Sequence, residues 1–436
     1  MPLIFRFSLR IAALALKFLL TIAIARALGF SAVADYGLAL AVSVVASKLL
    51  GLGFSAEINR RLSLPNPRSA IRDTRGVLLL YGAAYALIAL LVISARELSA
   101  FDALDRIQPG VLWGVMLVAF SEHAGLETNS WVFSLHRARA GAIFLFVRTG
   151  AWAGVAVLGL MVGAVHSIET VFVLWWATNA LVVIAACLFI AHTRKALDRT
   201  AVRVARVSQG AYVGHRAGVR AVWIDGLPFF FATVVLSGLQ YAERFVASGM
   251  VTASELGRYV FAWSIANTIQ TIAYATIVVT AGPRLVRALE VSPHEFGATL
   301  HRSVRASLGI SAGCAAGVLI ASKPIFSISH QPAGAHEYAL LAILLVSFLL
   351  RSLADVLWSS AIALRLGRRV SVAICGVAAV CVPAGWLLIA HVGTLGAAIA
   401  HLCASVGIVS ILVWLVARAH GSAVSQFRKG GVLHAS

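Results

Sequence analysis

Long apolar runs alternate with short polar segments along almost the whole chain. Each run is about 20 residues long, the length that crosses a bilayer at about 1.5 Å of rise per helical residue. No hydrophilic stretch is long enough for a separate soluble domain. The pattern therefore predicts an all-α integral membrane protein with about 12 transmembrane helices. We place these helices near residues 10–28, 37–57, 76–95, 110–134, 141–164, 169–191, 221–247, 258–282, 303–322, 338–363, 370–391 and 394–416.

The first two predicted helices have a counterpart in the second half of the chain. Residues 17–58 read KFLLTIAIARALGFSAVADYGLALAVSVVASKLLGLGFSAEI, two apolar runs joined by the short polar hinge GFSAVADYG at 29–37. A similar pattern returns at 245–269 as FVASGMVTASELGRYVFAWSIANTI, with Gly249 in the place of Gly29. Two copies of one helix–turn–helix about half a chain apart indicate a duplicated membrane protein.

The duplication predicts two pseudo-symmetric six-helix lobes, residues 1–192 and 221–436. The linker between them, 193–220, contains seven basic residues and one acid, Asp198. Part of it spaces its arginines so that a helix would be basic on one side and apolar on the other. A surface helix on the inner leaflet and a plain charged linker both fit this segment.

The distribution of charge gives an orientation. The chain is 60% hydrophobic and only 12% charged, with a net charge of +19, whereas soluble domains are about 25% charged. Most lysines and arginines lie at the chain ends and in every second gap between predicted helices, and the intervening gaps hold few. This is the positive-inside pattern with both termini in the cytoplasm, so the excess charge does not indicate binding to a nucleic acid.

Ionisable residues inside the predicted spans are the candidates for function, because such groups are costly in a membrane. Lys17 and Lys48 lie on adjacent helices and fit one interior chamber, although long side chains of this kind also reach the membrane surface. Lys48 is the stronger interior candidate because it is predicted midway along its helix. Arg148 also fits a side chain that reaches the cytoplasmic surface. The full set is Lys17, Lys48, Glu122, Glu127, Arg148, Asp225, Glu243, Arg244, Arg351 and Asp355.

Two pairs of polar residues inside the predicted spans are spaced four residues apart. His123 and Glu127 share a helix face, while Glu122 points elsewhere. This pair fits the uptake of a proton or a sodium ion, and equally a hydrogen-bonded structural pair. Arg351 and Asp355 are expected to form an intrahelical ion pair, although Arg351 is also a candidate for holding an anion.

Two further features concern the seventh predicted helix. Glu243 and Arg244 are adjacent, about 100° apart around the helix, and are not expected to face one target. Asp225 stands three residues before Pro228, which would free a backbone carbonyl and bend the helix near an acid. We count Glu122, His123, Glu127, Asp225 and Asp355 as ion-coupling candidates.

Enzymatic chemistry is not indicated. The sequence has no P-loop, nucleophile elbow, His-Glu-x-x-His motif or CxxC pair, and its five cysteines show no metal-ligand spacing with histidine. The gaps on the predicted outer side are short, which disfavours a membrane glycosyltransferase or polymerase with a large catalytic loop. We expect a protein that is not an enzyme, with no cofactor and no metal.

The two copies resemble a known family. The segments ARALG…ADYG and LGFSAEINRRL in the first copy, and ERFVASGMVTASELGRYVFAWSI in the second, are similar to bacterial polysaccharide-repeat (O-antigen and exopolysaccharide) flippases. These belong to the multidrug/oligosaccharidyl-lipid/polysaccharide exporter superfamily. Twelve spans in two lobes with cytoplasmic termini extend the resemblance over essentially the whole chain.

The resemblance implies a flippase of the bacterial cytoplasmic membrane. It would move an undecaprenyl-diphosphate-linked oligosaccharide between leaflets by rocking of the two lobes, with membrane lipids, a polysaccharide polymerase and export machinery as partners. By position and chemistry, Lys17, Lys48, Arg148, Arg244 and Arg351 are the candidates for contact with the diphosphate. A multidrug or cation antiporter of the same superfamily is the main alternative, and a lipid II flippase comes third because those usually have two further helices. Ten ionisable groups inside the spans disfavour a scaffold without transport activity.

Overall fold

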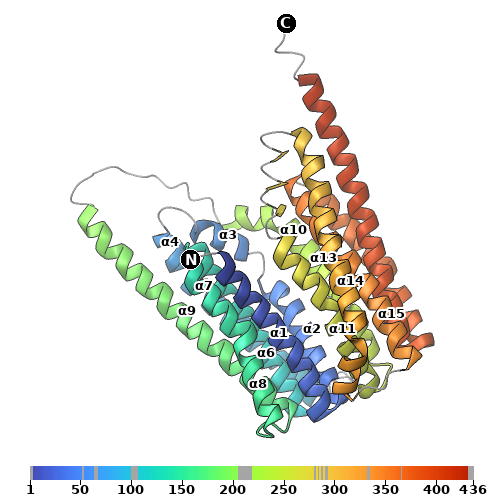
Figure 1. The fold of residues 1–436 in the computed structure, drawn as a ribbon. Helices are drawn as coiled ribbons and strands as arrows, with labels where there is room; N and C mark the ends of the chain where they lie inside the picture. Colours follow the sequence, from blue (N-terminus) through green and yellow to red (C-terminus); the bar gives the residue numbers. More distant parts are fainter. Residues whose placement is uncertain are drawn as a thin grey trace. The chain divides into compact units, whose positions relative to one another are not determined.

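The computed structural model describes residues 3–51, 54–62, 67–99, 107–204, 219–278, 281–282, 284–285, 288–289, 293–330, 334–364 and 366–430. All regular secondary structure in these ranges is helical, which confirms the predicted all-α class (Figure 1). The chain forms two compact units that do not follow a single cut in the sequence. Unit 1 comprises Met1–Leu20 and Leu38–Phe230, and unit 2 comprises Thr21–Gly37 and Phe231–Ser436.

Unit 1 is built around the packing of α6 against α9. Its core includes the fully buried rings of Tyr81, Trp131 and Trp175. Polar residues that would be costly facing lipid are also buried inside the unit, among them His123, Glu127 and Asn129 on α6. The helices that contribute to it are α1 (Leu3–Leu28), α2 (Phe30–Leu50), α3 (Phe54–Leu62), α4 (Arg68–Glu97), α6 (Pro109–Ser134), α7 (Ala138–Phe146), the π-helix η1 (Val147–Ala151), α8 (Trp152–Met161) and α9 (Ile168–Val204).

Unit 2 is organised around α14, which packs against α15, α11 and α13. Helix α15 is two helices joined at Gly393, whose backbone has φ +62° and ψ −135°, so it contains two of the predicted spans. Trp263, Phe348 and Ile374 are among the fully buried side chains. The helices of this unit are α10 (Val219–Ser248), α11 (Ala253–Ala273), the π-helix η2 (Tyr274–Val278), α13 (Pro293–Ile328), α14 (Ala335–Ala363) and α15 (Gly367–Gly430).

Eight helices in the described ranges are long and apolar enough to cross a membrane. The predicted spans at 110–134, 221–247 and 258–282 also fall on helices, namely α6, α10, and α11 with η2. These three helices are not among the eight apolar helices. In α6, the charged residues Glu122 and Glu127 lower the hydropathy. Helix α9 runs to Val204, so the first part of the predicted linker 193–220 is helical, while residues 205–218 lie outside the described residues.

The predicted nine-residue hinge at 29–37 is wrong. Only Gly29 breaks the helix, with φ +83°, and α2 begins at Phe30. Glycine adopts this left-handed conformation without a steric penalty, so one residue is enough to reverse the chain. Gly249 is not equivalent to Gly29, because the second turn rests on a capping box between Thr252 and Glu255 at the start of α11.

The early start of α2 changes the expected depth of Lys48. Lys48 lies in the last turn of α2, whereas Lys17 is near the middle of α1. The prediction that Lys48 is the deeper of the two lysines is therefore wrong. The error follows from the hinge, because placing the start of the helix near residue 37 moved its midpoint toward residue 48.

The tip of the α1–α2 hairpin is tightly packed within unit 2. A Cβ added to Gly257 on α11 would lie 1.7 Å from the carbonyl oxygen of Phe30. The Phe30 ring also makes an edge contact with Phe261, with ring centroids 5.8 Å apart. The backbone of α11 therefore approaches the start of α2 more closely than any side chain at position 257 would allow.

Candidate functional site: two buried ionic clusters

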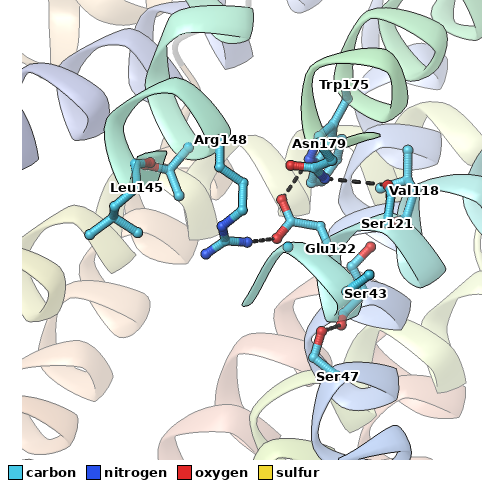
Figure 2. A network of polar contacts seen from close by, with 12 residues as sticks. Ser43, Ser47, Val118, Ser121, Glu122, Leu145, Arg148, Trp175 and Asn179 are labelled. Atoms are coloured by element: carbon cyan, nitrogen blue, oxygen red, sulfur yellow. Dashed lines mark hydrogen bonds and ion pairs between the residues drawn. The ribbon is translucent and has the colours of Figure 1, made fainter. Parts of the chain in front are cut away.

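The first cluster, which we call the Glu122 cluster, surrounds Glu122 of α6 and comprises Lys17, Glu122, Arg148 and Trp175. Figure 2 shows Glu122 between Arg148 and Trp175. Both oxygens of the Glu122 carboxylate are occupied. Oε2 forms an ion pair with Nη1 of Arg148, and Oε1 accepts a hydrogen bond of 2.6 Å from the indole nitrogen of Trp175. Arg148 is only 5% exposed, so it points into the unit and does not reach the membrane surface.

The position of Arg148 depends on an irregularity that the sequence did not reveal. Residues Val147–Ala151 form η1, a single π-helical turn between α7 and α8. A π-turn inserts an extra residue into the helical repeat, so it rotates the side chains on either side of it relative to each other. Such turns are common at functional sites, and here the turn contains the buried arginine.

Lys17 brings a second positive charge to this cluster from α1. It interacts electrostatically with Glu122 and Arg148, and its Nζ lies 5.8 Å from the centroid of the Trp175 ring. Trp175 stacks on Trp152, with ring centroids 4.7 Å apart, which gives the cluster an apolar wall. Two cations around one carboxylate leave a net charge of +1 when all three groups are ionised.

A third group of ionisable side chains in unit 1 comprises Lys48 on α2 and His123 and Glu127 on α6. Glu127 Oε1 accepts a hydrogen bond of 2.7 Å from Ser55, and His123 Nδ1 is hydrogen-bonded to the hydroxyl of Tyr85. Lys48 interacts electrostatically with both Glu127 and His123. The His123–Glu127 pair shares a helix face, but each side chain bonds to a different helix. The other polar atoms of the pair, His123 Nε2 and Glu127 Oε2, have no hydrogen-bond partner among the described residues.

The second cluster, which we call the Arg244 cluster, lies in unit 2 and comprises Tyr241, Glu243, Arg244, Tyr259 and Trp263. Arg244 is fully buried, and its Nη1 donates a hydrogen bond of 2.8 Å to the carbonyl of Gly37. Its guanidinium lies 3.9 Å from the centroid of the Trp263 ring and 5.1 Å from that of Tyr241. Glu243 instead accepts a hydrogen bond of 3.1 Å from Tyr259, so the adjacent acid and base have different partners.

Arg351 and Asp355 on α14 do not form the predicted intrahelical ion pair. Arg351 Nε donates to Ser405 Oγ on α15 at 3.1 Å. Asp355 Oδ2 accepts from Gln270 Nε2 on α11 at 2.9 Å. The prediction fails because α14 is covered by other helices on these faces, and each side chain finds a partner there that isolated-helix reasoning does not include. Within the part of the chain that the structure describes, Arg351 Nη2, like Nε and Nη2 of Arg244, has no hydrogen-bond partner.

Several side chains at these clusters were not among the predicted site residues. One predicted site residue has its side chain outside the described part of the structure. The side chains that the sequence did not single out are Trp175, Tyr259, Trp263 and His401. The signal that could have found them is a polar ring or hydroxyl atom inside an apolar span. His401 Nδ1 is hydrogen-bonded to Ser347 at 2.6 Å, next to the serine that binds Arg351. Asp225 and Pro228 lie on α10, but their side chains are outside the described part of the structure.

No family model and no curated protein matches the chain by sequence. An inward-facing multidrug resistance MATE family transporter of the MOP superfamily superposes with a TM-score of 0.67 at 14% identity, covering 98% of this chain and 99% of the other. The chain shares the fold of this transporter.

Two more solved structures extend this likeness. The lipid II flippase MurJ, in an inward closed conformation, matches with a TM-score of 0.55 at 13% identity, covering 99% of this chain and 93% of MurJ. A MOP superfamily transporter from Pyrococcus furiosus, described as having a binding pocket of reversed polarity, matches with a TM-score of 0.57 at 14% identity, over 96% of this chain and 94% of that one. At these identities the comparisons establish the fold alone.

Proposed function

We propose that this protein is a flippase that moves undecaprenyl-diphosphate-linked oligosaccharide repeat units across the bacterial cytoplasmic membrane for surface polysaccharide biosynthesis. The observation that carries the proposal is the composition of the Glu122 cluster, the buried Arg148 and the partly buried Lys17 around one carboxylate. A net positive charge in a low-dielectric interior attracts an anionic diphosphate and disfavours a cationic drug. The fold and the resemblance of the duplicated turn segments agree with this reading.

The candidate residues then take different roles. Lys17 and Arg148 would contact the diphosphate, with Lys48 and Arg351 as further contacts in units 1 and 2. Arg244 is already held by the Gly37 carbonyl and the Trp263 ring, so we assign it to packing of the hairpin tip as well as to charge. Glu122, His123, Glu127, Asp225 and Asp355 remain our candidates for ion coupling. A polysaccharide polymerase and export machinery would act on the product in the same membrane.

A multidrug or cation antiporter is the second candidate. The observation in its favour is Glu127, a buried carboxylate with one hydroxyl donor and with an oxygen that no described residue contacts by a hydrogen bond. Such a carboxylate can hold a cation or a proton. The positive charge of Lys48 beside Glu127 disfavours the binding of a second cation to this carboxylate.

The proposal predicts a defined lipid intermediate in cells. Deleting the gene should cause an undecaprenyl-diphosphate-linked oligosaccharide to accumulate on the inner leaflet, with loss of surface polysaccharide, both measured by mass spectrometry. Lys17→Gln should restore about 10- to 100-fold less transport than the wild type, because one charge-assisted hydrogen bond contributes about 1.5–3 kcal/mol.

The matched control is Lys323→Gln, which removes the same charge from an exposed position on α13. It should complement fully. Full complementation by Lys17→Gln would remove Lys17 from the site while leaving the function in place. No accumulation in the deletion strain, together with new sensitivity to cationic drugs, would favour the antiporter.

A further inference from the structure

A pocket of about 510 Å³ lies in unit 1 beside the turn between α6 and α7, away from the Glu122 cluster. The turn itself supplies His136, Arg137 and Arg139, and His136 has the positive φ of 57° that reverses the chain. Two exposed arginines therefore stand at one mouth of the pocket. The described residues that line it include no aspartate or glutamate.

The backbone at this place adds to the positive potential. Arg137 is the N-cap of α7, and no side chain caps the first turn of that helix. The first N–H groups of a helix have no partner within the helix, and together with the helix dipole they favour an anion. A phosphate oxygen at the turn would thus meet both guanidinium and backbone donors.

The opposite wall of the pocket is apolar. Ile143 on α7 is 41% exposed, and Phe189 on α9 packs edge-on against Phe144 with centroids 6.2 Å apart. The apolar surface continues along α9, where Leu181, Ile184 and Leu188 are each more than half exposed. In a protein that crosses a membrane, such a stripe is covered by lipid chains.

We propose that this pocket binds the headgroup of an anionic glycerophospholipid, with an acyl chain lying over Ile143 and Phe189 and on along α9. Charge complementarity selects the headgroup, because basic pockets between spanning helices on the positive-inside side are suited to anionic lipid phosphates. The charge pattern of the chain puts the α6–α7 turn on that side. The site is independent of the transport proposal, since none of its residues belongs to the ionic clusters described above.

The test uses the full chain purified in a neutral detergent, with lipid retention measured by native mass spectrometry and thermal stability measured in parallel. Phosphatidylglycerol should bind and raise the Tm, and phosphatidylcholine of the same chain length should not. The double variant Arg137→Gln/Arg139→Gln should weaken phosphatidylglycerol binding by about tenfold or more, because each arginine near an anionic lipid surface contributes to the attraction.

The matched control is Arg72→Gln/Arg75→Gln, which removes the same charge from two exposed arginines on α4. It should retain phosphatidylglycerol like the wild type. Ile143→Ser should also weaken binding while keeping both arginines, which an interaction of charge alone would not explain. Equal loss in the two arginine variants, equal retention of phosphatidylcholine, or the same Tm increase with inorganic phosphate alone would each overturn the proposal.

Discussion

Gly257→Ala is expected to prevent the hairpin tip from packing in unit 2. The new Cβ would lie 1.7 Å from the Phe30 carbonyl oxygen and 2.5 Å from its carbon, and a backbone group cannot rotate away as a side chain can. The start of α2 and α11 would have to separate, which also strains the hydrogen bond from Arg244 to Gly37. Overpacking of a well-packed interior costs about 1–3 kcal/mol, and we expect the upper end or beyond here.

The measurement is the Tm of the detergent-purified variant, followed by size-exclusion chromatography after heating. A loss of about 3 kcal/mol corresponds to a decrease of about 6–12 °C in a domain of this size. Gly313→Ala is the matched control, since a Cβ at that helical position on α13 meets nothing within 4 Å. It should leave the Tm unchanged or raise it slightly, because alanine favours the helix over glycine. A wild-type Tm for Gly257→Ala would contradict the close approach of these backbones.

Glu122→Ala is expected to destabilise unit 1 more than removal of both partners of its ion pair. The substitution leaves Arg148 buried without its carboxylate and removes the acceptor of the Trp175 N–H. Breaking one side of a buried pair costs about 3–5 kcal/mol, whereas replacing both charges by neutral groups of similar volume is often close to neutral. The double variant Glu122→Gln/Arg148→Met should therefore recover most of the lost stability.

A double-mutant cycle, in which the Tm and the free energy of unfolding are measured for each variant, gives the coupling energy of this pair. The single variants Glu122→Gln and Arg148→Met and the double variant Glu122→Gln/Arg148→Met should give losses that are far from additive, because the residues are in direct contact. The double variant should be folded and yet deficient in transport, since it lacks a cation that we assign to the diphosphate. Additive losses would show that the pair contributes little to stability, and full transport by the double variant would remove Arg148 from the proposed site.

Local sequence patterns predicted the parts of this fold that depend on local chemistry. Apolar run length located the spanning helices, since a membrane allows few alternatives to a helix of that length. The break at Gly393 falls between two predicted spans, and the ionisable residues singled out in the spans include the members of both clusters that carry charge. These features follow from residue type and spacing alone.

The incorrect or missing predictions concern hydrogen-bond partners from distant segments, the start of one helix and one irregular helical turn. Arg351 and Asp355 have ideal spacing for an ion pair, but Ser405 and Gln270 from other helices bind them instead. Lys48 was misplaced because a polar sequence after Gly29 resembles a turn, although its residues form the first turns of α2. The π-turn that holds Arg148 has no signature in a single sequence, because it arises from packing against neighbouring helices.

The claim that this chain is a flippase for anionic lipid-linked sugars is tested most directly with the purified protein in proteoliposomes. The measurement follows the transfer of an undecaprenyl-diphosphate-linked oligosaccharide from one leaflet to the other, with a fluorescent cationic drug as the competing substrate. We predict transfer of the lipid-linked sugar by the wild type and by Lys323→Gln, and about 10- to 100-fold slower transfer by Lys17→Gln. Transport of the cationic drug without transfer of the lipid-linked sugar would contradict the account.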